Sequence, residues 1–188
     1  SLFKTESITT VRKMLQNTGS VFKELFGQNY WTNRWVKDVL ESDVKQILEC
    51  ALSAPTGMNL QTWSFVAIMN REKIQKLAKA VGKALNRENY NMYNPSVLIL
   101  TTNDKESRFR EVDNACALEN IYLSCEALGL GCVWINQLKD CFDEPEVRSI
   151  LDELGVPKNH GVYGSAAIGY KTQEALPKEI KGTYKIVK

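Results

Sequence analysis

Residues 54–63 read APTGMNLQTW, and they connect a stretch with helical spacing of apolar residues to a short apolar run. The proline and glycine of this segment are common turn residues, so turn chemistry accounts for them. It does not account for Thr56, Asn59 and Gln61 occurring together, because one hydroxyl and two carboxamides can all hydrogen-bond a planar heteroaromatic ligand. The segment therefore predicts a ligand-binding loop between a helix and a strand.

The chain of 188 residues has the length and composition of one globular domain. Hydrophobic residues make up 44% and charged residues 24%, values that disfavour disorder. The formal net charge is +2, and the basic residues are dispersed rather than interleaved with aromatics, which argues against nucleic-acid binding. No apolar run approaches the length of a membrane span. We therefore expect one domain that binds neither nucleic acid nor a membrane.

The cysteines indicate a reducing compartment. Five are scattered along the chain, none in a Cys-x-x-Cys pair, and an odd number does not suit a disulfide framework. The single histidine, His160, lies in a segment that reads as a turn, and no residues with zinc-ligand spacing accompany it. The sequence thus predicts a cytoplasmic protein without a metal site.

Hydrophobic periodicity predicts alternating helices and strands after a helical opening. Residues 6–17 and 20–27 have helical character, whereas 29–35 is aromatic and polar with no clean period. Further helices are expected at 42–52, 71–85, 111–128 and 145–154, and strands at 63–69, 97–102, 132–135 and 162–170. Such an order predicts an α+β fold, an α/β/α sandwich with a mixed sheet of four core strands flanked by helices.

The expected helix at 111–128 is apolar almost all round, which is typical of a helix in the centre of a core or at an interface. A chain of this size does not readily cover such a helix by itself. The final segment, 183–188, alternates weakly and predicts an edge strand with no obvious partner nearby in the sequence. Both features predict a homodimer in which the C-terminal strand is exchanged to the partner subunit.

The segment 54–63 resembles the Pro-Ser-Gly-x-Asn-x-Gln-Pro-Trp loop of the nitroreductase family, the FMN-dependent NAD(P)H oxidoreductases. Thr56 stands in place of the serine, and Thr62 in place of the second proline. Three further segments match the family in the same order: its central helix running into a Gly-Leu-Gly-x-x-Trp strand, a strand end closing on Gly-Tyr, and a late Pro-Lys pair. These lie at residues 119–135, 166–170 and 176–178.

The resemblance implies a single nitroreductase-like domain over residues 1–188. Within it, residues 1–19 would form an N-terminal helical extension and residues 171–188 a tail that crosses to the partner subunit. The implied cofactor is FMN, bound without a covalent bond. The residues expected to contact it outside the N-terminal region are Thr56, Met58, Asn59, Gln61, Asn136, Lys178 and Lys181.

In the family these positions have different roles, and the resemblance carries the roles over to this chain. Asn59 and Gln61 would meet the edge of the flavin ring, and the backbone of Asn136 and Gln137 would lie near the ring nitrogen that accepts hydride. Lys178 would bind the phosphate, and Lys181 would assist it. No side chain is expected to be catalytic, because the flavin carries the redox chemistry.

The N-terminal region departs from the family, which opens its flavin site with Arg-Arg-Ser-x-Arg. Thr32 and Arg34 lie at the family spacing before the helix at 42–52, but Tyr30 and Trp31 replace the paired arginines. The alternative is Arg12, which matches the letters better and requires an insertion of roughly twenty residues. Spacing favours Thr32 and Arg34, and in either register at least one phosphate-binding arginine is missing.

The resemblance implies hydride transfer from NAD(P)H to FMN and then to a small oxidised acceptor, such as a nitroaromatic, a quinone or a flavin, in a ping-pong mechanism. Two other interpretations stay open from the residues. The chain could be a flavin-binding protein of the same fold with a different or lost reductive activity. It could also be a non-enzymatic interaction module that uses the empty cleft as a groove.

Overall fold

The computed structural model describes residues 30–171 and 179–187, with side chains from Glu41 onward. The chain divides into two compact units, Ser1–Ser53 and Ala54–Lys188, and each is described by itself. The expected helices at 6–17 and 20–27, and with them the extension 1–19, lie outside the described residues.

The described part of the first unit is one helix, α2, which spans Tyr30–Leu52. The expectation that a helix begins at Glu41 or Ser42 is therefore wrong. The stretch from Tyr30 to Leu52 contains neither proline nor glycine, so no residue interrupts the backbone hydrogen bonds before the apolar stripe begins. Thr32 and Arg34 consequently lie in the first turns of a helix rather than in a loop.

The second unit is built on a four-stranded sheet in the order β1-β2-β4-β3. The strands span Trp63–Ile68 (β1), Val97–Asp104 (β2), Leu130–Ile135 (β3) and His160–Tyr170 (β4). All four expected strands are present, with no boundary shifted by more than two residues. Every pairing among them is antiparallel, so the described sheet has none of the parallel pairings that a mixed sheet implies.

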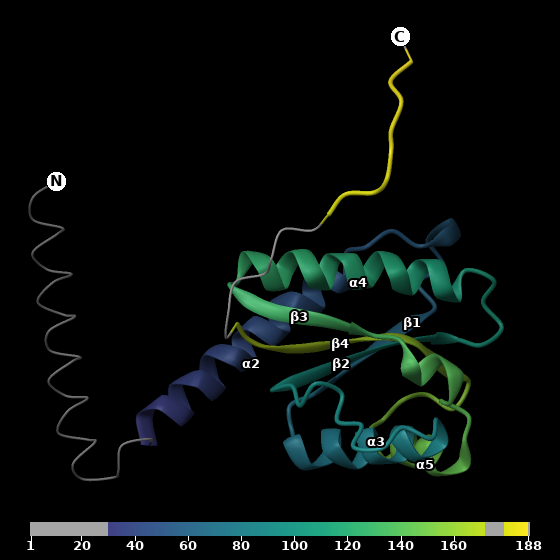
Figure 1. The fold of residues 1–188 in the computed structure, drawn as a ribbon. Coiled ribbons are helices and arrows are strands. Elements are labelled where there is room, and N and C mark those ends of the chain that lie inside the picture. The colour runs from purple at the N-terminus through teal and green to yellow at the C-terminus, as the bar shows by residue number, and fades with distance from the viewer. Residues whose placement is uncertain (1–29, 172–178, 188) are drawn as a thin grey trace, which may run out of the picture. The chain divides into compact units, whose positions relative to one another are not determined.

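Helices cover both faces of this sheet. Helix α4 (Arg110–Ala127) lies on one face, and α3 (Arg71–Ala84) and α5 (Pro145–Glu153) lie on the other, as Figure 1 shows. Two short 3₁₀ turns, η1 (Gly57–Asn59) and η2 (Gln137–Asp140), follow the first helix and β3. The expected α/β/α sandwich is therefore confirmed. Among the helices of the described residues, none combines the length and apolar character that crossing a membrane requires.

The larger core fills the space between the sheet and the α3–α5 layer. Leu98 and Leu100 of β2 alternate toward this layer, where Leu77 of α3 and Leu151 of α5 are fully buried. On the opposite face, Gly164 of β4 lets α4 approach closely, since a Cβ there would lie 2.5 Å from Leu118 Cδ1. The small residue in β4 therefore allows the middle of α4, at Leu118, to pack close to the sheet.

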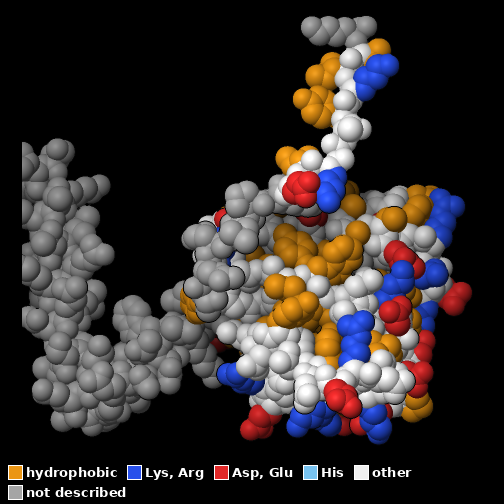
Figure 2. Space-filling view, in the orientation of Figure 1, with side chains coloured by type: hydrophobic (Ala, Val, Ile, Leu, Met, Phe, Trp, Pro, Cys, Tyr) orange, Lys and Arg blue, Asp and Glu red, His pale blue; other side chains and the backbone are white. Residues whose placement is uncertain are grey.

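Part of the apolar surface remains exposed. Val112 and Leu123 of α4 are each 60% exposed, and Trp134 of β3 is 56% exposed. Figure 2 shows hydrophobic side chains gathered over the region where β3 faces the viewer in Figure 1. The tail residues 179–187 form neither helix nor strand, so the expected edge strand is not formed in the described part of the tail.

Candidate functional site

The loop between α2 and β1 contains three residues with a left-handed backbone, a feature that it shares with the segment 86–94. Met58, Asn59 and Gln61 all have left-handed torsions, with φ of 54°, 55° and 48°. Asparagine adopts this region readily, whereas methionine and glutamine do so rarely. Each such residue costs about 1–3 kcal/mol, and the conformation persists only where surrounding groups impose it. The loop is therefore held in a shape that its own sequence does not favour.

Hydrogen bonds within the loop bring the three polar residues together. The backbone N–H of Asn59 donates to Thr56 O at 3.0 Å, and that of Gln61 donates to Thr56 Oγ1 at 3.3 Å. Gln61 Nε2 donates to Asn59 Oδ1 at 2.9 Å. The other amide atom of each side chain, Asn59 Nδ2 and Gln61 Oε1, takes no part in this bond. Both side chains are exposed, so these two atoms can hydrogen-bond a ligand. The loop thus presents a donor beside an acceptor.

Buried polar groups anchor the loop at both of its ends. Asp113, in the first turn of α4 and 3% exposed, accepts a hydrogen bond from Gly57 N at 2.8 Å through Oδ1. Thr62 Oγ1 donates to Asn103 Oδ1 at 2.7 Å, and Asn103 Nδ2 donates to Asn114 Oδ1 at 3.2 Å. Sequence analysis missed these anchors. The available signal was an aspartate followed by an asparagine in the first turn of a helix with apolar residues on several faces.

A shallow groove of about 320 Å³ borders the loop. Its wall includes Met58, Leu60 and Phe109, and a Cβ on Gly57 would lie 2.4 Å from the Phe109 ring. The guanidinium of Arg108 lies over this ring, 4.4 Å from its centroid, and one of its nitrogens is 3.8 Å from Met58 Sδ. Only glycine fits at position 57 without moving this ring.

Asn136 and Gln137 follow β3 directly. Asn136 is exposed and precedes η2, where its carbonyl accepts a hydrogen bond from Lys139 N at 3.1 Å. Gln137 Oε1 accepts a hydrogen bond from the Tyr90 hydroxyl at 3.2 Å. Burial raises the pKa of Tyr90 to about 12, with Arg87 acting in the opposite direction, so this phenol remains a donor at physiological pH. The bond orients the turn that carries Asn136.

The loop and the Asn136 turn lie at the same end of the sheet but at opposite edges. The loop leads into β1 and the turn leaves β3, and these are the two outermost strands. Three inter-strand spacings of about 4.8 Å separate them by roughly 14 Å. One subunit therefore does not bring the predicted ring contacts of its loop and of its Asn136 turn to one point.

The remaining predicted contacts are only partly described. Lys178 lies outside the described residues. Lys181 is exposed and forms an ion pair with Glu179 at 3.4 Å. Thr32 and Arg34 belong to α2, and their side chains are not among those described. Of the residues expected to contact the cofactor, the structure brings together the four of the loop: Thr56, Met58, Asn59 and Gln61.

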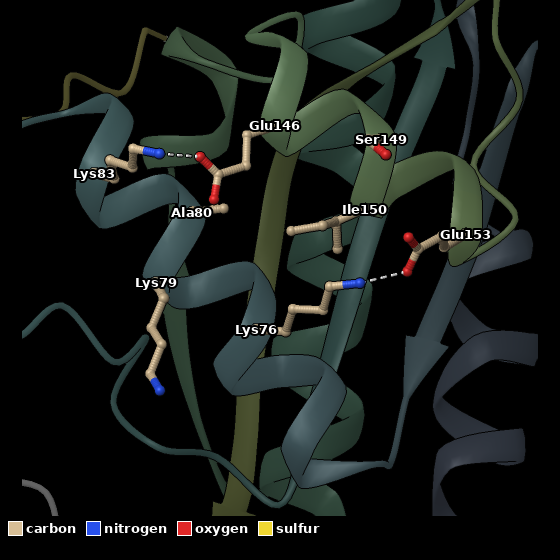
Figure 3. Close-up of a pocket in the computed structure, with 8 residues that line it drawn as sticks. All are labelled: Lys76, Lys79, Ala80, Lys83, Glu146, Ser149, Ile150 and Glu153. Carbon is tan, nitrogen blue, oxygen red and sulfur yellow. Dashed lines mark hydrogen bonds and ion pairs between the residues drawn. The ribbon is translucent and has the colours of Figure 1, made fainter.

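A second hollow, of about 440 Å³, lies between α3 and α5 (Figure 3). Lys76 pairs with Glu153 at 2.7 Å and Lys83 pairs with Glu146 at 2.6 Å across it. Lys79 points away from both pairs in Figure 3. Because these two lysines are already neutralised by carboxylates on the facing helix, this hollow offers little to an anionic ligand.

Two cysteines hydrogen-bond between α4 and β3. This bond lowers the pKa of Cys125 and, together with burial, raises the pKa of Cys132. Cys125 is only 1% exposed, so a lowered pKa does not make it accessible to a substrate. The pair is therefore not a nucleophilic centre, and the loop with its anchors is the strongest candidate site among the described residues.

The model of the nitroreductase family matches residues 37–96 and 86–170, which together make up most of the chain. The chain belongs to the nitroreductase family.

Individual relatives cover similar shares of the chain. A Bacteroides fragilis nitroreductase solved with bound FMN is 38% identical, with a TM-score of 0.73, over 78% of this chain and 87% of its own. A Desulfitobacterium hafniense nitroreductase with bound FMN is 21% identical, with a TM-score of 0.66, over 77% and 86%, and it supports the fold. A protein from Archaeoglobus fulgidus, provisionally named an NADH dehydrogenase/NAD(P)H nitroreductase, is 26% identical over 73% of this chain and 78% of its own.

Proposed function

We propose that this nitroreductase-family chain binds FMN and transfers hydride from NAD(P)H to a small oxidised acceptor, such as a nitroaromatic, a quinone or a flavin. The observation that carries the proposal is the loop at 56–61, whose left-handed backbone and internal hydrogen bonds gather its polar groups. The 38% identical relative that was solved with FMN supports the choice of cofactor.

The donor set of the loop fits a flavin. The edge of the flavin ring alternates carbonyl and N–H groups, so Asn59 Nδ2 and Gln61 Oε1 can donate to one and accept from the next. Lys178 and Lys181 supply positive charge for the phosphate, with Thr32 and Arg34 as the proposed contacts from α2. When bound, FMN would supply the hydride chemistry, and the protein would bind, orient and shield it.

We propose a homodimer in which each flavin site is shared between subunits. The roughly 14 Å between the loop and the Asn136 turn supports this arrangement, because a partner subunit can bring its own turn to the loop. Exposed Val112, Leu123 and Trp134 provide an apolar surface for the contact. An exchanged C-terminal strand belongs to the same proposal.

We further propose a ping-pong reaction in the cytoplasm. NAD(P)H and acceptor would use the same exposed face of the flavin in turn, and double-reciprocal plots would then be parallel. None of the five cysteines, all of which lie among the described residues, forms a disulfide, which agrees with a reducing compartment. Neither a metal nor a thiol is needed for the reaction, so a chelator and a mild alkylating reagent should leave most of the activity.

A visible absorption spectrum of the reconstituted protein, recorded before and after NADH is added, tests the proposal. Bound oxidised flavin that bleaches with NADH, and recovers with a quinone or nitroaromatic, is the expected result. Flavin that binds but does not bleach with NADH or NADPH would identify a flavoprotein with another or a lost activity. If calorimetry at tens of micromolar detects no FMN binding, the proposed function is wrong.

A further inference from the structure

We infer that Asp113 is the positioning residue of the flavin loop, with Asn103 as its second anchor. Neither would contact the cofactor. Both act through the loop, Asp113 through the backbone N–H of Gly57 and Asn103 through the hydroxyl of Thr62. The inference rests on the proposed function, since the ligand of the loop is taken to be FMN.

The strained backbone requires an external anchor. Three of the four residues from Met58 to Gln61 have left-handed backbone torsions, and Leu60 is the exception. The bond from Gly57 N to Asp113 Oδ1, 2.8 Å long, joins residues 56 positions apart and enters the loop just before the first of these torsions. A charge-assisted bond from a buried carboxylate is among the stronger constraints that a side chain can place on a backbone.

The chemistry of Asp113 also points to a role beyond packing. Its second oxygen, Oδ2, is buried and has no hydrogen-bond partner among the described residues. A buried carboxylate with one satisfied oxygen is costly, and a neutral acceptor would satisfy the same N–H. No ion pair joins Asp113 to a cation in the described part of the chain. The charge therefore strengthens a single bond, the one that fixes Gly57.

The second anchor is a feature of this chain's own sequence. Thr62 occupies the position where the family loop has proline, which has no hydroxyl to donate. Here the Thr62 hydroxyl donates to Asn103, a fully buried residue whose amide in turn donates to Asn114 on α4. Because Asp113 and Asn114 are adjacent, both ends of the loop are tied to the same turn of α4.

The Phe109 ring completes the arrangement. Phe109 immediately precedes α4, and its ring atoms would lie only 2.4 Å from a Cβ on Gly57. Asp113 holds Gly57 close to the helix, and Phe109 limits how close it can come. The start of α4 thereby sets the distance of the loop from the sheet and, with it, the direction in which Asn59 and Gln61 point.

Two variants of one residue separate positioning from packing. Asp113→Ala removes the acceptor, and we expect the dissociation constant for FMN to rise about tenfold or more. Asp113→Asn retains an acceptor oxygen and should restore binding to within about threefold. The control is Thr101→Val, which removes another fully buried side-chain bond, to Gly164 O, away from the loop. It should leave FMN affinity and the visible circular dichroism of bound FMN unchanged.

Amide hydrogen exchange at Gly57 provides a readout without cofactor. It should be slow in the wild-type protein and in Asp113→Asn, and fast in Asp113→Ala. If Asp113→Ala does not fold, Thr62→Val, which changes a half-buried side chain, should loosen residues 61–62 and weaken FMN binding by a few-fold.

The outcomes distinguish the two proposals. Wild-type protein that does not bind FMN, yet shows Gly57 protection that Asp113→Ala abolishes, would refute the cofactor and retain the anchor. Folded Asp113→Ala with wild-type affinity and wild-type exchange at Gly57 would overturn the inference. An equal loss of affinity in Asp113→Ala and Thr101→Val would overturn it too, because the effect would then follow general destabilisation.

Discussion

Gly57 has no room for a side chain, and this makes it the most sensitive position in the loop. A Cβ would lie 2.4 Å from two atoms of the Phe109 ring, so Gly57→Ala must displace either the ring or the loop. Overpacking of this kind costs about 1–3 kcal/mol. We expect Gly57→Ala to lower stability in urea by that amount and to weaken FMN binding.

The matched variant is Gly57→Ala combined with Phe109→Ala, which removes the obstructing ring. The combination should be less destabilised than the sum of the two single changes, because the clash is shared. Additive losses would mean that Gly57 and Phe109 do not interact in solution.

His160 is the residue that couples stability to mild acid. Thr102 Oγ1 donates its one hydrogen to Ser64 O at 2.8 Å, so it must accept from His160 Nδ1, 3.0 Å away. Burial lowers the pKa of His160 below its usual 6.5, with the nearby Asp104 carboxylate opposing the shift and Arg148 adding to it. The ring is therefore neutral in the folded protein near pH 7, with the proton on Nδ1.

The stabilising effect of this neutral histidine is complete above the unfolded pKa of about 6.5. As the pH falls from there toward the lower folded pKa, the unfolded chain takes up a proton that the folded chain does not, and stability is lost. We expect the free energy of unfolding in urea to fall less steeply between pH 7.5 and pH 5.5 in His160→Gln than in the wild-type protein. Equal slopes would exclude His160 as a contributor.

At the scale of elements, the α3–α5 layer is held by its apolar side rather than by the ion pairs across its hollow. Leu151 is fully buried in the core cluster, whereas Lys76 and Glu153 are both more than half exposed. Leu151→Ala should therefore cost about 2–5 kcal/mol. Lys76→Ala should cost less than about 1 kcal/mol, and still less in high salt. Urea unfolding of the two variants measures both, and a larger loss in Lys76→Ala would reverse this assignment.

Strands and helices with clear hydrophobic periodicity were predictable from the sequence, whereas the start of α2 and the anchoring of the loop were not. The buried strands are apolar runs, and α3, α4 and α5 have helical stripes, so their periodicity was sufficient to predict them. The start of α2 was missed because helix can continue through Tyr30–Trp35 without an apolar stripe. The anchoring by Asp113 was missed because it joins residues 56 positions apart, which no local pattern records. The strand expected at 183–188 remains a prediction, since it requires a second subunit.

At the scale of the whole molecule, shared flavin sites can be tested by mixing subunits. Asn59→Ala and Arg34→Ala should each raise the FMN dissociation constant at least about tenfold, whereas Arg12→Ala should change it little. If Asn59 and Arg34 of one site come from different subunits, a heterodimer of the two variants contains one site with both changes and one site with neither.

Subunit exchange between the two variants should therefore restore about one FMN per heterodimer, measured by flavin absorbance after gel filtration. If both residues of a site come from the same subunit, every site keeps one change and no binding returns. Light scattering that reports a monomer would refute the shared site directly.

The position of β4 has a consequence for how the chain folds as it is synthesised. β1 and β2 leave the ribosome in order and can pair at once, but β3 pairs only with β4 in the described sheet and has no native partner there until β4 is made. β4 is the last of the four strands to be made, and it forms hydrogen bonds on both sides. Until His160 and the residues after it emerge, the nascent chain holds two unjoined parts of a sheet with exposed edges. We therefore expect the nascent chain to be most prone to aggregation during this period.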